Sequence, residues 1–73
     1  MENKIEQAFT KHAATLDARG VANRGVDPAL VNRYFVKSPA FAEAVKGLSL
    51  HEILRAQAYA FSVAEAWVRS IPR

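Results

Sequence analysis

The residues with the clearest chemical potential are the two histidines and the carboxylates around them. His51-Glu52 begins like the helical motif of zinc proteases, which needs a second histidine on the same helix face one turn later. Arg55 stands at that position and brings a positive charge instead of a ligand. His12 is the only other histidine, and the chain has no cysteine. The sequence therefore predicts neither a structural nor a catalytic zinc site.

Acid–base and nucleophilic chemistry have no better support. Glu43, Glu52 and Glu65 fall on separate predicted helices or separate turns, where solvated carboxylates explain them without a shared proton. The chain has no glycine-rich phosphate loop, and no serine stands in a nucleophile elbow. We therefore predict a protein that is not an enzyme and that carries no cofactor and no metal.

Length and composition favour one small domain covering residues 1–73. The net charge is +3 and the pI is about 9.7, but basic and acidic residues alternate along the chain. This pattern is typical of a mixed-charge, soluble surface rather than a stripe built for polyanions. No run is apolar enough to span a membrane, and the first residues do not resemble a signal peptide. We expect a cytoplasmic protein without membrane contact.

The longest periodic segment predicts a helix near 50–70. Ser49 and Glu52 form a capping-box pattern at its start, and Pro72 ends the pattern. Glu65 precedes Arg69 by one turn, in the favourable orientation for an ion pair. Ten apolar residues share about half of the helical wheel: Leu50, Ile53, Leu54, Ala60, Phe61, Val63, Ala64, Trp67, Val68 and Ile71.

Three shorter helices are predicted before this one, near 3–18, 28–36 and 39–46. Asp27-Pro28 and Ser38-Pro39 are helix starts, because a capping side chain precedes a proline at the first helical position. Gly47 is expected to close the third helix. No alternating run predicts a strand, so the fold class is all-α, a small domain of about four helices of which the three shorter ones pack on the long C-terminal helix.

The segment near 19–27 is predicted to be a flexible linker. It carries Arg-Gly twice, and Arg19-Gly20 is interpreted as the stop of the first helix. A basic loop of this length in so small a protein is a place where order induced by a partner is expected.

Two stretches suggest other functions. The predicted helices 39–46 and 50–70, joined through Gly47, have the outline of a helix-turn-helix, and a nucleic-acid-binding regulator is therefore an alternative. Its recognition helix would open with Leu50, His51 and Glu52, which suits phosphates poorly. The stretch Pro39-Ala40-Phe41-Ala42-Glu43-Ala44-Val45, with Arg33-Tyr34 upstream, resembles the theta subunit of bacterial DNA polymerase III, which implies a helical accessory protein of a replicative polymerase.

The 73-residue length and the lack of catalytic motifs resemble a small regulator from a lytic Xanthomonas phage. That resemblance implies a host-takeover protein that binds bacterial RNA polymerase, inhibits initiation by displacing sigma and also acts as an antiterminator. Tyrosine and arginine are the residues that most often anchor such contacts. The candidate partner-binding residues are Arg19, Arg24, Arg33, Lys37, Arg55 and Tyr59.

Overall fold

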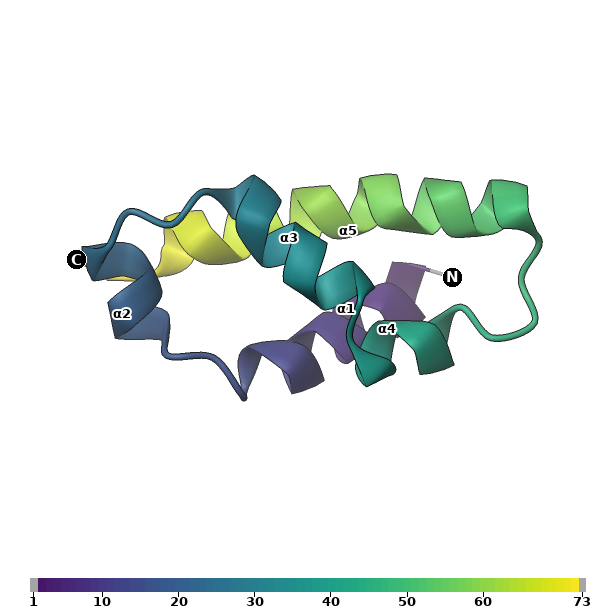
Figure 1. Cartoon of the computed structure of the whole chain (residues 1–73), viewed down its shortest axis with the longest axis horizontal. Coiled ribbons are helices and arrows are strands. Elements are labelled where there is room, and N and C mark those ends of the chain that lie inside the picture. The colour runs from purple at the N-terminus through teal and green to yellow at the C-terminus, as the bar shows by residue number, and fades with distance from the viewer. Residues whose placement is uncertain (1, 73) are drawn as a thin grey trace.

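The structure is a computed structural model that describes residues 2–72, and all the regular secondary structure of these residues is helical. The molecule measures 38 × 18 × 18 Å, and the longest helix runs along its long axis (Figure 1). The predicted all-α fold with a long C-terminal helix is confirmed. Its helices are α1 (Glu2–Ala13), α2 (Ala18–Asn23), α3 (Pro28–Val36), α4 (Pro39–Ala44) and α5 (Leu50–Ser70).

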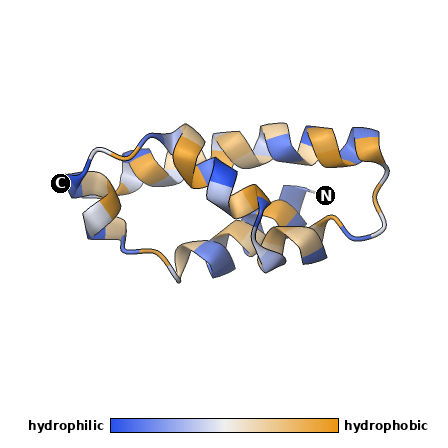
Figure 2. Ribbon diagram, in the orientation of Figure 1, coloured by the Kyte–Doolittle hydropathy of each residue, from blue (hydrophilic) through white to orange (hydrophobic). Residues whose placement is uncertain are grey.

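Helix α5 packs against α1 and α3, and α4 packs mainly on α1 and also touches α3. Helix α2 lies at the end of the molecule where the C-terminus also lies (Figure 1). Apolar residues recur along the whole length of α5 (Figure 2). None of the helices in residues 2–72 combines the length and the hydropathy that crossing a membrane requires.

The centre of the core is a chain of aromatic rings in edge-to-face contact. The ring of Phe9 lies 5.0 Å from that of Phe35 and 5.7 Å from that of Trp67, and the rings of Phe35 and Phe41 are 5.3 Å apart. These centroid distances are the favourable range for aromatic pairs. The four rings come from α1, α3, α4 and α5, so they join every helix except α2.

The predicted helix starts are all present. Asp27 and Ser38 cap α3 and α4 with their side chains, and α3 and α5 begin and end where they were predicted. Ser49 and Glu52 form the complete capping box of α5, with N–H···O distances of 3.1 and 3.2 Å. The helix predicted at 39–46 ends earlier, at Ala44, with Val45 as its C-cap. Gly47, with a positive φ of 84°, lies in the turn beyond that end and does not close the helix itself.

The first helix was predicted to reach residue 18, but α1 ends at Ala13. The Thr15 hydroxyl donates a 2.6 Å hydrogen bond to the carbonyl of His12. Such a local bond satisfies a carbonyl of the last turn and competes with continuation of the helix. The turn that follows carries Leu16 to a half-buried position against the core.

The linker predicted at 19–27 is partly helical, because α2 occupies most of it. Asp17 caps this helix by accepting a 3.1 Å hydrogen bond from the backbone N–H of Gly20. Gly20 was interpreted as a stop, but it lies inside α2. A Cβ at this position would stand 2.5 Å from a carboxylate oxygen of Asp17 and 2.9 Å from the guanidinium of Arg24, so a larger residue would displace the ends of these two flexible side chains.

The buried face of α5 is shifted from the predicted apolar arc. The residues that are completely buried are small and recur every four positions, whereas three large members of the predicted arc are exposed. The buried residues are Ala56, Ala60 and Ala64, and the exposed ones are Leu50, Leu54 and Phe61.

Candidate protein-binding surface

The outer face of α3 carries two apolar side chains among cations. Val31 and Phe35 point into the core and are buried. Because 100° separates successive helical residues, the positions beside that inner face turn outward. They are occupied by Leu30, Arg33, Tyr34 and, one residue past the helix, Lys37, which are all exposed. Their spacing of three, four and seven residues places them on one face of the helix.

Tyr34 stands between two hollows. The first has a volume of about 240 Å³ and lies between α3, α2 and the segment that follows α1. Its lining is mostly apolar, and Tyr34 and His12 line both hollows. The residues around the first hollow are His12, Leu16, Val21, Arg24, Val26, Leu30, Val31 and Tyr34.

The second hollow is wider, at about 550 Å³, and lies on the α1 and α4 side of Tyr34. It is lined by Lys11, His12, Thr15, Tyr34, Lys37, Ser38, Pro39 and Ala40. Tyr34 is 62% exposed, although a ring of this size could bury far more of its surface. A large exposed aromatic ring between two apolar hollows has the features of a residue that anchors a protein interface.

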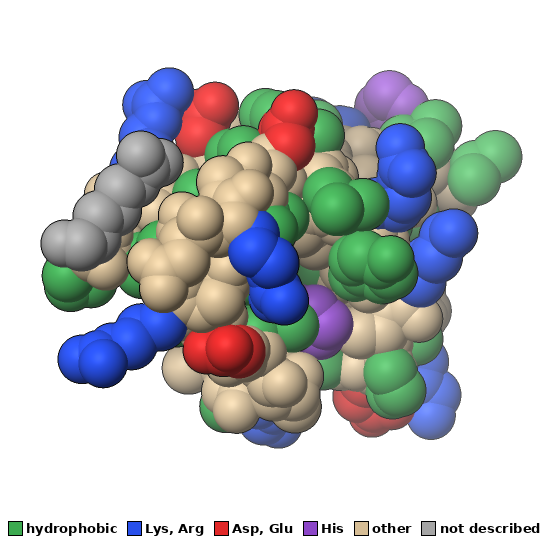
Figure 3. Space-filling view, turned by 60° about the vertical axis from the view of Figure 1, so that its left-hand side comes forward, with side chains coloured by type: hydrophobic (Ala, Val, Ile, Leu, Met, Phe, Trp, Pro, Cys, Tyr) green, Lys and Arg blue, Asp and Glu red, His purple; other side chains and the backbone are tan. Residues whose placement is uncertain are grey.

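Every charged side chain that lines the two hollows is a cation. Lys11, Arg24 and Lys37 supply these charges, and Arg33 adds a fourth on the same face of α3. The space-filling view shows a face of the molecule on which Lys and Arg side chains stand around apolar ones, with Asp and Glu side chains among them (Figure 3). We call this region the Tyr34 surface and define it by Lys11, His12, Arg24, Leu30, Arg33, Tyr34 and Lys37.

His12 forms the floor between the two hollows. Its ring lies 5.6 Å from the ring of Phe35 and 6.4 Å from that of Phe9. Its Nε2 atom is buried and has no hydrogen-bond partner within residues 2–72. Burial lowers the pKa of His12, so the imidazole is neutral at pH 7. His12 therefore belongs to the boundary of the core, and its neutral ring adds an apolar group to both hollows.

The structure separates the six residues proposed as partner contacts. Arg24, Arg33 and Lys37 all belong to the Tyr34 surface. Arg19 is exposed on α2 but lines neither hollow, and Arg55 is exposed on α5.

Tyr59, the sixth, is half-buried against the core. Burial raises the pKa of its hydroxyl, and the carboxylates of Glu6 and Glu2 add to that shift. Its ring therefore packs between α5 and α1, and Tyr34 has the exposure that was expected of Tyr59.

Sequence reasoning missed Tyr34 and Leu30 because both fell on the apolar side of the predicted helix. The available signal was the pair Arg33 and Lys37, which lie three and seven residues after Leu30. Charges at that spacing around an apolar residue indicate a solvent-facing arc. Lys11 comes from α1, so only the tertiary fold places it here.

The other patterns considered in the sequence do not form a second candidate site. Among residues 2–72, no three histidine or acidic side chains gather as metal ligands would. The hydrogen bonds from Ser49 lower the pKa of Glu52, and this shift is fully explained by the role of Glu52 in the capping box.

Phe41 and Val45 of the alanine-rich stretch are buried, so core packing accounts for that pattern. Helix α4 packs mainly on α1, whereas a helix-turn-helix pairs its two helices with each other.

No family model, curated protein or solved structure matches this chain.

Proposed function

We propose that this chain is a non-enzymatic regulator that binds a protein partner through the Tyr34 surface. The observation that carries the proposal is the largely exposed Tyr34 ring between two apolar hollows whose charged linings are all cationic. Tyrosine and arginine are enriched among residues that dominate binding energy. Cations around such an anchor attract an acidic partner and orient it during encounter.

The chemistry of the partner follows from that of the surface. Apolar or aromatic side chains of the partner would fill the hollows on either side of Tyr34, and carboxylates would face Lys11, Arg24 and Lys37. An amphipathic, acidic segment has both features. Bound this way, an 8.1 kDa protein acts by covering a surface or by holding its partner in one conformation.

The most concrete partner is bacterial RNA polymerase. The length of the chain and its lack of catalytic motifs support this choice through the resemblance to a small phage regulator. The chain would be phage-encoded, would occupy an acidic patch of the enzyme in the host cytoplasm and would weaken the hold of the enzyme on sigma at initiation. Persistence of the same contact during elongation would account for antitermination.

The test is capture of polymerase from a bacterial lysate by the tagged full chain, followed by transcription in vitro with purified components. Tyr34→Ala should weaken binding by about 2 kcal/mol or more, as loss of an anchoring tyrosine does. The double substitution Arg33→Glu and Lys37→Glu should weaken it at least as much, because it replaces attraction by repulsion. Inhibition of initiation should fall in parallel with binding.

Arg55→Glu is the matched control, since it reverses an exposed charge on α5, outside the Tyr34 surface. An equal effect of this variant would place the contact elsewhere. Retention of no polymerase subunit, together with unchanged transcription, would reject the polymerase. Tight binding to duplex DNA that is lost steeply with salt would instead favour a nucleic-acid-binding regulator, and retention of the proofreading exonuclease would favour a replicative accessory role.

A further inference from the structure

Helix α5 carries a second exposed apolar strip, whose residues do not line the hollows of the Tyr34 surface. Leu50 is 73% exposed, Leu54 55% and Phe61 37%. Their separations of four and seven residues, continued by Val68 seven residues further on, keep them on one side of the helix. This is the spacing with which helices pair along a seam. We call Leu50, Leu54 and Phe61 the α5 strip.

A groove of about 770 Å³ continues the α5 strip toward the C-terminal end of the helix. One bank is α5, with Val68 and Ile71, and the other is the segment before and at the start of α3, with Val26 and Pro28. Apolar side chains therefore form part of each bank, beside polar groups. Three charged residues also line the groove: Asp27 on one bank, and Glu65 and Arg69 on the other.

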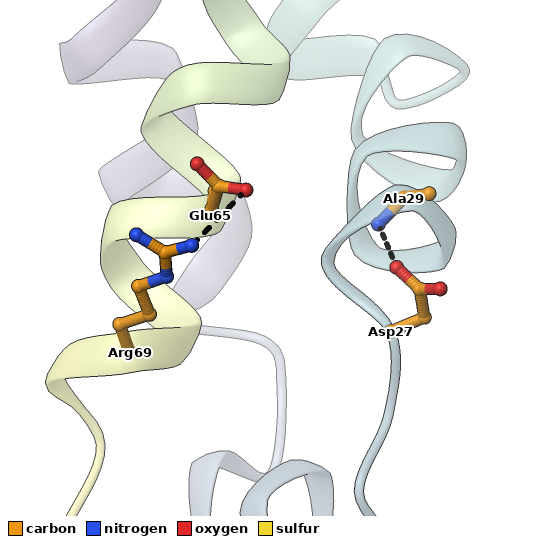
Figure 4. A network of polar contacts seen from close by, with 4 residues as sticks. All are labelled: Asp27, Ala29, Glu65 and Arg69. Atoms are coloured by element: carbon orange, nitrogen blue, oxygen red, sulfur yellow. Dashed lines mark hydrogen bonds and ion pairs between the residues drawn. The ribbon is translucent and has the colours of Figure 1, made fainter.

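Both acidic groups of the groove have their own partners within the chain, which fixes their positions. Asp27 accepts a 2.8 Å hydrogen bond from the backbone N–H of Ala29. Glu65 lies 3.6 Å from Arg69 in an exposed ion pair. Figure 4 shows Asp27 and the Glu65–Arg69 pair on two separate elements. Each carboxylate still has an oxygen free to accept from another molecule.

We infer that the α5 strip and this groove are the two halves of a self-complementary interface, and that two copies of this chain pair through antiparallel α5 helices. His51 and Glu65 each lie seven residues from Ala58. A two-fold axis beside Ala58 therefore places His51 opposite the partner's Glu65, twice. The same axis carries Leu50 to the stretch of the partner's α5 that forms the groove.

Charge and chemistry favour this arrangement. The N-terminal end of a helix carries a partial positive charge, and the pairing brings the start of α5 to the partner's Asp27 and the partner's Glu65. The His51 side chain can donate a hydrogen bond to a carboxylate there. Leu50 supplies an apolar group for the apolar side chains of the groove, Val68 and Ile71. The small side chain of Ala58 at the axis lets the two helices approach closely.

The size of the interface sets its strength. The α5 strip exposes on the order of a few hundred Å² of apolar surface, and the groove adds to it. A standard stable interface buries about 800 Å² on each partner. The pairing is therefore a reversible dimer that depends on protein concentration, and it leaves the Tyr34 surface open.

Sedimentation equilibrium of the full chain, from about 10 µM to about 1 mM, should show a mass that rises from 8.1 kDa toward twice that value. Leu50→Glu should raise the dissociation constant of the dimer at least tenfold, because it replaces an apolar contact side chain by a charge that must lose its water on pairing. Ala42→Glu is the control, since Ala42 is exposed on α4, outside the α5 strip and the groove, and it should leave the dimer intact. Circular dichroism verifies that each variant is folded.

Cross-linking tests the register. The chain has no cysteine, so Ala58→Cys and Ala66→Cys each introduce a single thiol at an exposed position of α5. A short bismaleimide should link two copies of Ala58→Cys rapidly and two copies of Ala66→Cys at least tenfold more slowly. A mass of 8.1 kDa at every concentration, or equal cross-linking of both variants, would overturn the inference. Capture of polymerase should be the same for Leu50→Glu as for the unaltered chain, so this test and that of the proposed function fail independently.

Discussion

The two sides of α5 reverse the usual relation between residue size and burial. Ala56, Ala60 and Ala64 are completely buried on one side. On the other, Leu50 and Leu54 are more than half exposed. The alanines recur once per turn, where α1 and α3 lie against the helix. The leucines lie in the N-terminal half, where α5 extends along an edge of the molecule (Figure 1).

The difference shows that burial on this helix is decided by how closely its neighbours approach. Interiors are packed at the density of organic crystals, so a helix that approaches another at close range must present small side chains there. Larger side chains then have room only at the flanks of the contact or outside it. A pattern of apolar residues gives the width of such a face, but the neighbouring helices decide where its centre lies.

The largest expected effect that tests this comparison is overpacking of the alanine side. Ala60→Leu adds three carbon atoms at a position with no exposed surface, and it should lower the free energy of unfolding by about 1–3 kcal/mol. Urea denaturation followed by circular dichroism measures this change.

Ala66→Leu makes the same substitution at an exposed position of the same helix and should change the free energy of unfolding by less than about 0.5 kcal/mol. A similar loss of stability in both variants would mean that leucine is unfavourable along the whole of α5, and the comparison between its two sides would fail.

The helix boundaries that could be predicted are those set by local chemistry. Asp27, Ser38 and Ser49 each bond to the backbone within three residues, so a short stretch of sequence contains the whole signal. The end of α1 was harder, because Thr15 breaks the helix before the periodic pattern stops. Helix α2 was missed because Gly20 indicates a stop, whereas it lies inside a short helix that Asp17 caps.

Of the residues of the candidate site, only the cations could be predicted from the sequence. Arg33 and Lys37 were recognised as surface cations from their own helix, and the structure keeps them together with Arg24. Tyr59 was predicted as a contact and Tyr34 was not, but the structure has Tyr34 exposed and Tyr59 half-buried. Each lies near the edge of an apolar face, and the packing of neighbouring helices covers only Tyr59. Periodicity within one helix has no information about that choice.

An intermediate loss of stability is expected from a substitution at the start of α5, because the Ser49 cap stabilises the first turn of the exposed half of this helix. Ser49→Ala removes the acceptor for the backbone N–H of Glu52 and should cost about 1 kcal/mol. Protection of the first-turn amides from hydrogen exchange should fall more than that of the amides near Ala64, which is held by packing.

The same cap gives a pH dependence with a defined sign. Hydrogen bonding to Ser49 lowers the pKa of Glu52 below its ordinary value of 4.5. The stability that this carboxylate contributes is therefore present above pH 4.5 and is lost as pH falls through the lower pKa of the folded state. Glu52→Gln should remove this acid-dependent component. An unchanged acid transition in that variant would show that the box contributes nothing to the stability of α5.

The smallest effect on the free energy of unfolding is expected for substitution of the exposed leucines. Its dependence on protein concentration distinguishes the single chain from the proposed dimer. Leu54→Gln should change the free energy of unfolding by less than about 0.5 kcal/mol in dilute solution, although a leucine lost from a core costs about 2–5 kcal/mol. At high protein concentration the unaltered chain should gain stability from pairing, because only the folded state associates, and Leu54→Gln should gain less. Melting temperatures at two concentrations a hundredfold apart measure both effects. A large loss at the lower concentration would place Leu54 within the core of the single chain, and the contrast between the two sides of α5 would then be false.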